Sequence, residues 1–356
     1  MADQTDWYRD QTVFLAGGTG YLGACLLYKL TLQAPTRRVF VLCRKSVQHA
    51  IAKLEELMPE QSDEVLDTGK VHFVVGNLDC RDRGMKPADL QCLREQVTVA
   101  IQAATEASII ANLLQVVQTN CLASLSLLET ICSFPFLRTL LCISSAFVNI
   151  FVPDMLIKEE TGTSLLSKRF PNPYIFSKYL AERATLDQTD TLPFTLPVVR
   201  PSLICPAILH PYPSYGVDKV TLVYSGLQMI ASSEYGIERL GRELPPGSYI
   251  DELPVDLVAN ICIVHLAKRT DRSPLIPSFF FFCKKLIPML VEAAVVHSYR
   301  TYRRRRGWSA EWIAMVGRAL GYTWVSACPM LRHPAYYLVL RAVGSENHPS
   351  LYWTIP

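Results

Sequence analysis

Residues 13–23 read VFLAGGTGYLG, an apolar run that ends directly at three glycines spaced three apart. The run has the length and composition of a buried strand, and apolar residues recur at helical spacing after the glycines. Glycines between a strand and a helix let backbone N–H groups approach a pyrophosphate at the helix start. The stretch therefore predicts a Rossmann-type unit with a dinucleotide site; an empty connecting turn is the alternative. The expected cofactor contacts here are Gly17, Thr19, Gly20, Tyr21, Leu22 and Gly23.

The rest of the first half alternates between strand-like and helix-like segments. Apolar runs of strand length lie within residues 37–45, 70–79, 97–105 and 137–149. Helix-length segments, such as 51–60 and 112–133, lie between them. This alternation predicts an α/β fold, a doubly wound parallel sheet whose ligands bind at the carboxyl ends of the strands. We expect a dinucleotide-binding domain over 1–272, with substrate-shaping elements mainly in 203–272, and a smaller, mostly helical C-terminal part over 273–356 that contributes to substrate binding.

Composition narrows the class of protein. A net charge of +3 gives little reason to expect a nucleic-acid partner. The eleven cysteines form no CxxC pair and no cluster with histidine, so we expect reduced thiols, no metal site and an intracellular protein. The N-terminal residues are too polar for a secretory leader, and no apolar stretch has the uninterrupted length of a membrane span.

The end of the second strand bears on the choice of cofactor. NAD-preferring folds usually place a carboxylate there, about 20 residues past the glycines, to bind the ribose hydroxyl. This chain has Arg44 and Lys45 instead. A guanidinium pairs with a 2′-phosphate, so the pattern favours NADPH; a solvated strand end is the alternative. Asn77 and Ala103, at the ends of the next two strands, are further expected cofactor contacts, with ordinary loop and packing roles as the alternative.

A second pattern carries candidate chemistry. Tyr174 and Lys178 are four residues apart in a segment that reads as helical, hence on one face. A nearby ammonium would lower the pKa of the phenol from its usual value of about 10 and make Tyr174 a usable acid. Ser144 and Ser145 end a predicted strand, where a second donor to a substrate oxygen is expected. The same residues also occur on ordinary amphipathic helices and in turns.

In order and spacing, GGTGYLG, SSA, NPYIFSKYLAE, LPVVRPSLICPA and YIDELPVDLVAN resemble an extended short-chain dehydrogenase/reductase over about residues 10–265. Within that superfamily they resemble the fatty acyl-CoA reductase and thioester-reductase branch, which has a male-sterility-type NAD(P)-binding domain. The resemblance implies that Ser145, Tyr174 and Lys178 carry catalysis. It also implies cofactor contacts from Leu78, Asn120, Lys178 and Pro201.

The sequence departs from that family in several places. The usual Thr before Ala is Ser145, the usual Asp after the third strand is Asn77, and Gln102 stands where a His is customary. The last 80 or so residues do not resemble the helical tail of the fatty acyl-CoA reductases.

The implied reaction is hydride transfer from NADPH to the carbonyl of an acyl thioester, bound to CoA or to a carrier protein, while Tyr174 and Ser145 hydrogen-bond the oxygen. The products are a thiol and an aldehyde, which a second hydride would reduce to a primary alcohol. One alternative is another enzyme of the superfamily that acts on a sugar, sterol or small alcohol or ketone. The other is a cofactor-binding protein without activity.

The C-terminal part combines aromatic and basic runs. Four phenylalanines in a row, Phe279 to Phe282, cannot all face one core. The basic run Arg303 to Arg306 lies beyond them. We predict peripheral membrane contact through residues 275–306, with a packed core and a solvated basic face as the alternative, and a cytoplasmic or peripheral location on an organelle membrane. Nucleic-acid binding is not expected, because the chain as a whole is near neutral.

Overall fold

The computed structural model describes residues 6–78, 80, 84–107, 112–149, 170, 172–216 and 252–268. All of these residues belong to one compact unit. The expected boundary at residue 273, the aromatic and basic runs and the membrane-contact stretch 275–306 lie outside the described residues. No helix in the described ranges is long and apolar enough to cross a bilayer.

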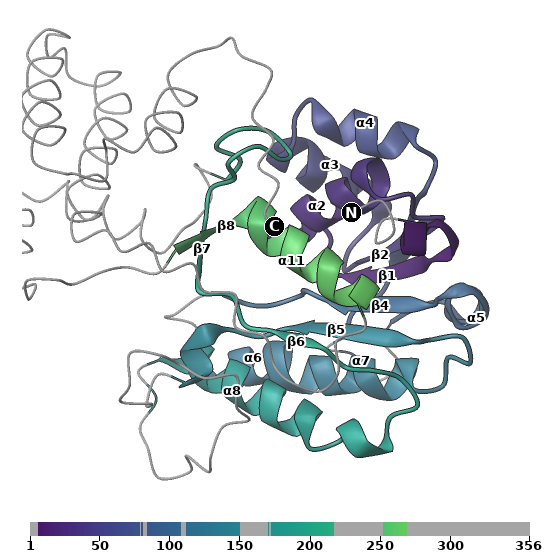
Figure 1. Cartoon of the computed structure of the whole chain (residues 1–356). Coiled ribbons are helices and arrows are strands. Elements are labelled where there is room, and N and C mark those ends of the chain that lie inside the picture. Colours follow the sequence, from purple (N-terminus) through teal and green to yellow (C-terminus); the bar gives the residue numbers. More distant parts are fainter. Residues whose placement is uncertain are drawn as a thin grey trace, which may run out of the picture. The chain divides into compact units, whose positions relative to one another are not determined.

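The described residues form a parallel α/β sheet with helices on both faces (Figure 1). Its strands, in chain order, are β1 (Thr12–Ala16), β2 (Arg38–Cys43), β3 (Val71–Val75), β4 (Val99–Gln102), β5 (Thr139–Ile143) and β6 (Val198–Val199). The helices are α2 (Tyr21–Tyr28), α3 (Val47–Leu57), α4 (Gln61–Asp67), α5 (Pro87–Gln96), α6 (Leu113–Val117), α7 (Ala123–Ile131), α8 (Pro173–Leu186) and α11 (Val255–Lys268). A second, two-stranded sheet pairs β7 (Leu203–Cys205) with β8 (Glu252–Pro254).

The strand order β3-β2-β1-β4-β5-β6 places β1 and β4 side by side at the centre. From β1 the chain builds the sheet outward through β2 and β3, and then returns to β4 to build the other half. Such a reversal leaves a crevice at the carboxyl ends of the two central strands, where ligands bind in doubly wound folds. The predicted fold class is confirmed for the described part of the chain.

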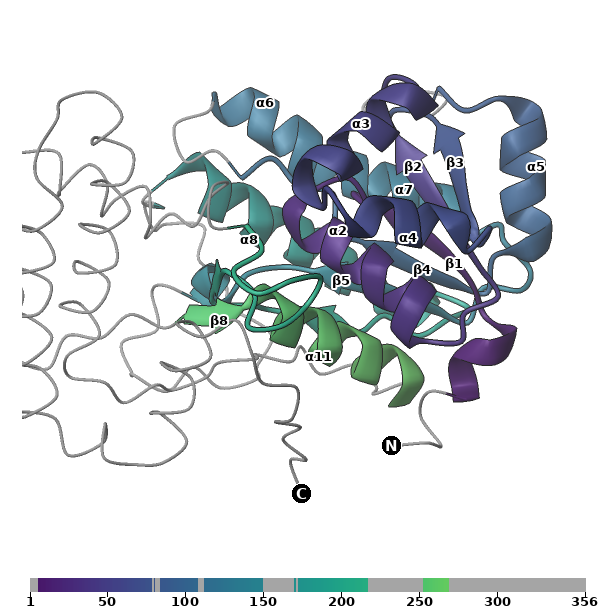
Figure 2. The same cartoon turned by 90° about the horizontal axis from the view of Figure 1, so that it is seen from above.

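The alternation of side chains along β1 explains the two layers of helices. Val13 and Leu15 point to the face covered by α2 and α11, while Phe14 and Ala16 point to the face covered by α7. Figure 2, viewed from above, shows α11 lying alongside α2. The strand is buried on both faces, which is why its sequence reads as an unbroken apolar run.

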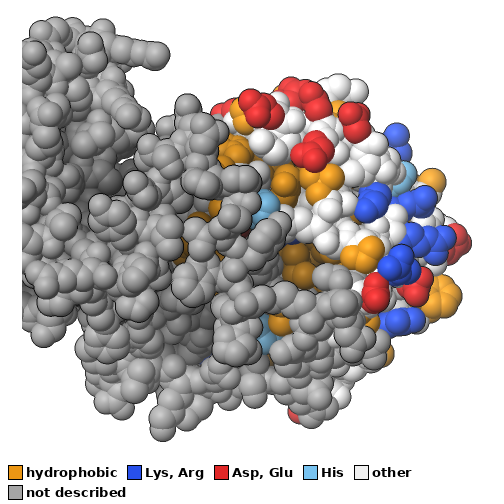
Figure 3. All heavy atoms as spheres, turned by 45° about the horizontal axis from the view of Figure 1, so that its top comes forward, with side chains coloured by type: hydrophobic (Ala, Val, Ile, Leu, Met, Phe, Trp, Pro, Cys, Tyr) orange, Lys and Arg blue, Asp and Glu red, His pale blue; other side chains and the backbone are white. Residues whose placement is uncertain are grey.

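The predicted helix over 112–133 is present but not regular. Between α6 and α7 the chain forms one π-helical turn, Gln118–Leu122, which buries Asn120 and Cys121. A second π turn, Lys29–Gln33, extends α2. Inserted π turns of this kind are frequent at functional sites. On the face shown in Figure 3, several acidic side chains gather at the top of the described part, while basic and acidic side chains lie side by side at its right.

Candidate active site

The glycine turn between β1 and α2 is packed so closely that two of its glycines admit no side chain. Gly17 has a φ of +87°, and a Cβ there would lie 2.5 Å from the backbone nitrogen of Ala104. A Cβ on Gly23 would lie 1.9 Å from the carbonyl oxygen of Gly17. A Cβ on Gly20 meets only that oxygen, at 3.3 Å. Gly20 therefore borders open space, while Gly17 and Gly23 hold the turn against β4 and the helix.

The start of α2 has the features of an anion site. Gly20 is its N-cap residue, and no side chain caps the helix. Backbone N–H groups in a first helical turn lack intrahelical partners, and the helix dipole favours negative charge there. Thr19 and Leu22 are half-buried at the same turn. The residues present thus fit the pyrophosphate of a dinucleotide.

The other expected cofactor residues follow the carboxyl ends of neighbouring strands. Arg44 directly follows β2, is exposed, and makes no hydrogen bond or ion pair within the described part of the chain. Asn77 is half-buried after β3, and Leu78 is buried among the apolar residues on the α7 face of the sheet. The N–H of Ala103 donates to the carbonyl oxygen of Ala16, 2.9 Å away, which ties the ends of β1 and β4 together. These positions share one edge of the sheet.

The three predicted catalytic residues come together at that same edge. Asn172 caps α8 by accepting a 2.9 Å hydrogen bond from the N–H of Ile175, so Tyr174 lies in the first turn and Lys178 one turn later. The hydroxyl of Ser145, beyond the end of β5, is hydrogen-bonded to the Tyr174 phenol. The ammonium of Lys178 donates to the carbonyl oxygen of Ile143, 2.9 Å away. Tyr174 and Lys178 thus lie on one helix beside the end of β5, and the catalytic roles of the three residues stay predictions.

The electrostatics of this group differ from the expectation. Burial raises the pKa of Tyr174 to about 12, and only the hydrogen bond with Ser145 lowers it. Burial lowers the pKa of Lys178 to about 8, while the nearby Cys142 and Glu182 raise it. The prediction that Lys178 lowers the pKa of the phenol is therefore wrong for this structure. The Lys178 ammonium donates to the end of β5, and burial is the largest influence on the pKa of the Tyr174 phenol.

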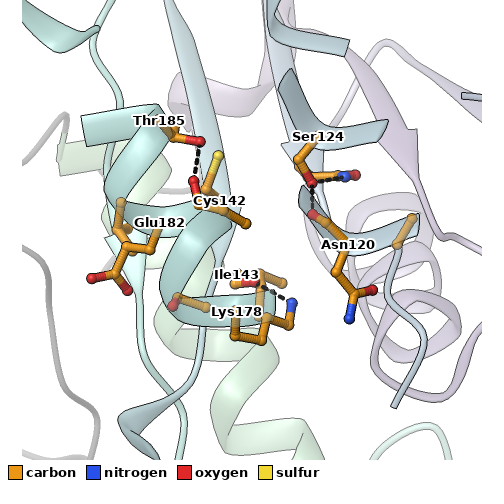
Figure 4. Close-up of a pocket in the computed structure, with 12 residues that line it drawn as sticks. Asn120, Ser124, Cys142, Ile143, Lys178, Glu182 and Thr185 are labelled. Atoms are coloured by element: carbon orange, nitrogen blue, oxygen red, sulfur yellow. Dashed lines mark hydrogen bonds between the residues drawn. The ribbon is translucent and has the colours of Figure 1, made fainter. Parts of the chain in front are cut away.

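A small cavity of about 30 Å³, lined by both polar and apolar side chains, lies beside Lys178, between the ends of β4 and β5 and the helices that cover them (Figure 4). Two buried oxygens that line it, Gln102 Oε1 and Ser144 Oγ, have no hydrogen-bond partner. The amide nitrogen of Gln102 donates to Ser124, which donates to the carbonyl oxygen of Asn120. The cavity has the size to hold buried water, and the two unpartnered oxygens could bind it.

Asn120, expected near the nicotinamide, is buried in the π turn and joins three segments. Its Oδ1 accepts from the N–H of Glu106 at 2.7 Å, and its amide nitrogen donates to Ser177 on α8 at 2.9 Å. Ser177 in turn donates to the carbonyl oxygen of Tyr174. The side chain of Asn120 therefore positions α8 relative to the loop after β4. Asn120 also lines the cavity beside Lys178.

Pro201 and Ser202, which follow β6, lie close to the same group of residues. The carbonyl oxygen of Pro201 accepts from the N–H of Ala146, 2.9 Å away, which places it next to Ser145. The hydroxyl of Ser202 is buried without a hydrogen-bond partner. Like the two unpartnered oxygens of the cavity, it is available to a ligand or a water, and no sequence motif indicated it.

The buried ion pair between Glu182 and Arg200 was also missed. Arg200 is fully buried, and its Nε lies 3.1 and 3.0 Å from the two carboxylate oxygens of Glu182. Glu182 follows Lys178 by one turn of α8. The available signal was the run KYLAE, which places a carboxylate four residues after the lysine, together with the arginine of VVRPS. The pair ties α8 to the end of β6.

A family model described as male sterility protein, a NAD-binding domain, matches residues 15–262. This chain belongs to the male sterility protein family. Both the family assignment and the glycine turn indicate that the matched part of the chain is a domain that binds a nicotinamide dinucleotide. No group of three or more potential metal ligands occurs among the described residues of this family member.

Two curated relatives of this male sterility family member are fatty acyl-CoA reductases by name. Fatty acyl-CoA reductase 2 of Mus musculus is 27% identical over 304 residues, which cover 74% of this chain and 57% of that protein. Fatty acyl-CoA reductase 1 of Xenopus laevis is 26% identical over 292 residues, covering 73% and 55%. The chain thus spans about half the length of the curated relatives it matches.

Among solved structures, the terminal R domain of the myxalamid PKS-NRPS biosynthetic pathway has the same fold as this male sterility family member. The TM-score is 0.64 with 18% sequence identity, and the match covers 96% of this chain and 87% of that one.

Proposed function

We propose that this protein is an NADPH-dependent reductase of acyl thioesters, with fatty acyl-CoA as the substrate to test first. The observation that carries the proposal is the group formed by Ser145, Tyr174 and Lys178, which lies at the same edge of the sheet as the glycine turn. The names of the curated relatives support acyl-CoA as the substrate class.

The preference for NADPH rests on Arg44. Its exposed guanidinium directly follows β2, at the position where NAD-preferring folds usually carry a carboxylate for the ribose hydroxyl. No other described residue binds this guanidinium, so it is available to a 2′-phosphate. Arginine presents a planar pair of donors that matches phosphate oxygens.

In the proposed reaction Tyr174 is the proton donor. Because its pKa is about 12, the phenol is protonated at neutral pH and can donate to the oxygen of the thioester carbonyl. The nicotinamide, when bound, supplies the hydride that the carbonyl carbon accepts. Ser145 is hydrogen-bonded to the phenol and provides a second donor to the oxygen as negative charge develops on it.

In the proposed reaction Lys178 supplies protons to the catalytic group. With a pKa of about 8, its ammonium exchanges a proton more readily near neutral pH than an ordinary lysine does. It can therefore restore a proton to this group after each turnover. The hemithioacetal formed from the substrate then loses its hydroxyl proton, the carbon–sulfur bond breaks, and the thiol takes up a proton to leave an aldehyde.

The test is to mix the purified chain with NADPH and acyl-CoA of several chain lengths, and to follow nicotinamide absorbance and free thiol together. We expect oxidation of NADPH coupled to thiol release, with one NADPH per thiol if an aldehyde is released and two if the alcohol is formed. NADPH that stays reduced with every acyl-CoA and acyl-carrier thioester, or that is oxidised by a sugar or sterol ketone without thiol release, would refute the proposal.

A further inference from the structure

The segment that follows β7 packs directly on the start of α2. The hydroxyl of Tyr21, the first residue of that helix, donates to the carbonyl oxygens of Cys205, at 2.9 Å, and Tyr215, at 3.2 Å. The hydroxyl of Tyr215 donates back to the carbonyl oxygen of Tyr21 at 2.7 Å. The two rings are stacked, with centroids 5.2 Å apart. The side chain of Tyr21 therefore points into this segment, and only its backbone borders the glycine turn.

The contact leaves no space between the two partners. Gly216 has a φ of +86°, and a Cβ there would lie 2.0 Å from Cε2 of the Tyr21 ring. Tyr215 is fully buried. We refer to Tyr21 and Tyr215 as the tyrosine pair.

Tyr215 is also held within its own segment. Its carbonyl oxygen accepts from the N–H of Ala207, 3.1 Å away. The next residues of that loop are held by the buried carboxylate of Asp256 on α11, which accepts from the N–H of Leu209 at 2.9 Å and from that of Ile208 at 3.2 Å. The tyrosine pair thus joins α11 to the first turn of α2.

We propose that Tyr215 is a positioning residue for the dinucleotide. Through the tyrosine pair it fixes the first turn of α2, whose backbone N–H groups face the pyrophosphate in the site described above. This inference rests on the proposed function, because it assigns a support to the cofactor site. It adds that the segment after β7, which lies within the stretch 203–272 expected to shape the substrate site, sets the affinity for the cofactor.

The proposal makes a distinctive prediction about the two nicotinamide cofactors. The pyrophosphate is common to NADPH and NADH, so removing a contact of the tyrosine pair should weaken the binding of both nucleotides to the same degree. Removing the side chain of Arg44 should weaken the binding of NADPH selectively. A residue that contributed only to global stability would alter neither affinity once the protein is folded.

The experiment compares Tyr215→Phe with Tyr212→Phe by fluorescence titration of both nucleotides. Tyr212 is a matched control from the same segment, since its hydroxyl donates to the carbonyl oxygen of Leu57, at the end of α3, at 3.0 Å. Each variant loses a hydrogen bond to a backbone carbonyl. We expect Tyr215→Phe to raise the Kd of NADPH and NADH alike by about three- to tenfold. We expect Tyr212→Phe to leave both Kd values within about twofold, and Tyr215→Phe to keep wild-type turnover at saturating NADPH.

Wild-type affinity in Tyr215→Phe, or an equal loss of affinity in the two variants, would overturn the proposal while the proposed function stands. A wild-type chain that binds neither nucleotide would overturn both. If Tyr215→Phe does not fold, Tyr21→Phe tests the same contact, because it removes the donor to Cys205 and Tyr215. Its nucleotide Kd values should rise together in the same way, and unchanged values would refute the role of the pair.

Discussion

Gly23 and Gly20 should respond differently to alanine, and the difference can be worked out from the structure. In Gly23→Ala the new Cβ would lie 1.9 Å from the carbonyl oxygen of Gly17, so backbone atoms would have to move apart by about 1 Å. Overpacking of this kind costs about 1–3 kcal/mol of unfolding free energy. In Gly20→Ala the same oxygen is 3.3 Å away and the backbone is extended, so we expect a cost within about 1 kcal/mol.

The effect on cofactor affinity should follow the opposite order: Gly20→Ala, which costs less stability than Gly23→Ala, should weaken cofactor binding more. Gly20→Ala places a methyl group at the turn, where the backbone must approach the pyrophosphate, and we expect its NADPH Kd to rise at least about tenfold, or 1.4 kcal/mol. Denaturant unfolding and fluorescence titration give the two quantities. Gly69→Ala is the control, since Gly69 has a φ of +66° with nothing within 4 Å and should lose stability but not affinity. Unchanged NADPH affinity in a folded Gly20→Ala would show that no pyrophosphate lies against this turn.

Three further variants test separate parts of the account. Arg44→Ala should weaken NADPH by about 1.5–3 kcal/mol and NADH hardly at all; an equal loss for both would show that Arg44 does not bind the 2′-phosphate. Burial lowers the pKa of Lys178 from 10.5 to about 8. In denaturant melts, the stability of wild type relative to Lys178→Met should therefore rise as pH increases from about 8 to 10.5. A difference in stability that does not change with pH would contradict that pKa. Glu182→Gln should cost about 3 kcal/mol of unfolding free energy, because it leaves the buried charge of Arg200 without its carboxylate, and a variant as stable as wild type would refute this.

Much of the fold could be predicted because it depends on local patterns. The apolar run before the glycines predicts a strand, and β1 occupies Thr12–Ala16. The four-residue spacing of Tyr174 and Lys178 predicts one helical face, and both lie on α8. Ser145 was expected near them because it follows a strand of a parallel sheet, and its hydroxyl is hydrogen-bonded to the phenol.

The features that could not be predicted depend on contacts between distant segments. The pKa of Tyr174 is set by how deeply the packed structure buries it, which spacing alone does not reveal. The tyrosine pair joins residues 194 positions apart. Tyr21 was expected to contact the cofactor, and no property of the turn indicates that its side chain is bound to the segment after β7. The helical spacing around Asn120 likewise predicted a regular helix and did not reveal the π turn at Gln118–Leu122.

The central claim is that Tyr174, supported by Ser145 and Lys178, donates the proton in the reduction of an acyl thioester. The most direct test is to measure NADPH binding and thiol release from acyl-CoA in parallel for wild type and Tyr174→Phe. We predict that the variant keeps the wild-type Kd for NADPH while its rate of thiol release falls by at least about 100-fold, since the ring still packs but the proton donor is lost. Thiol release by Tyr174→Phe at a rate near that of wild type would contradict the account.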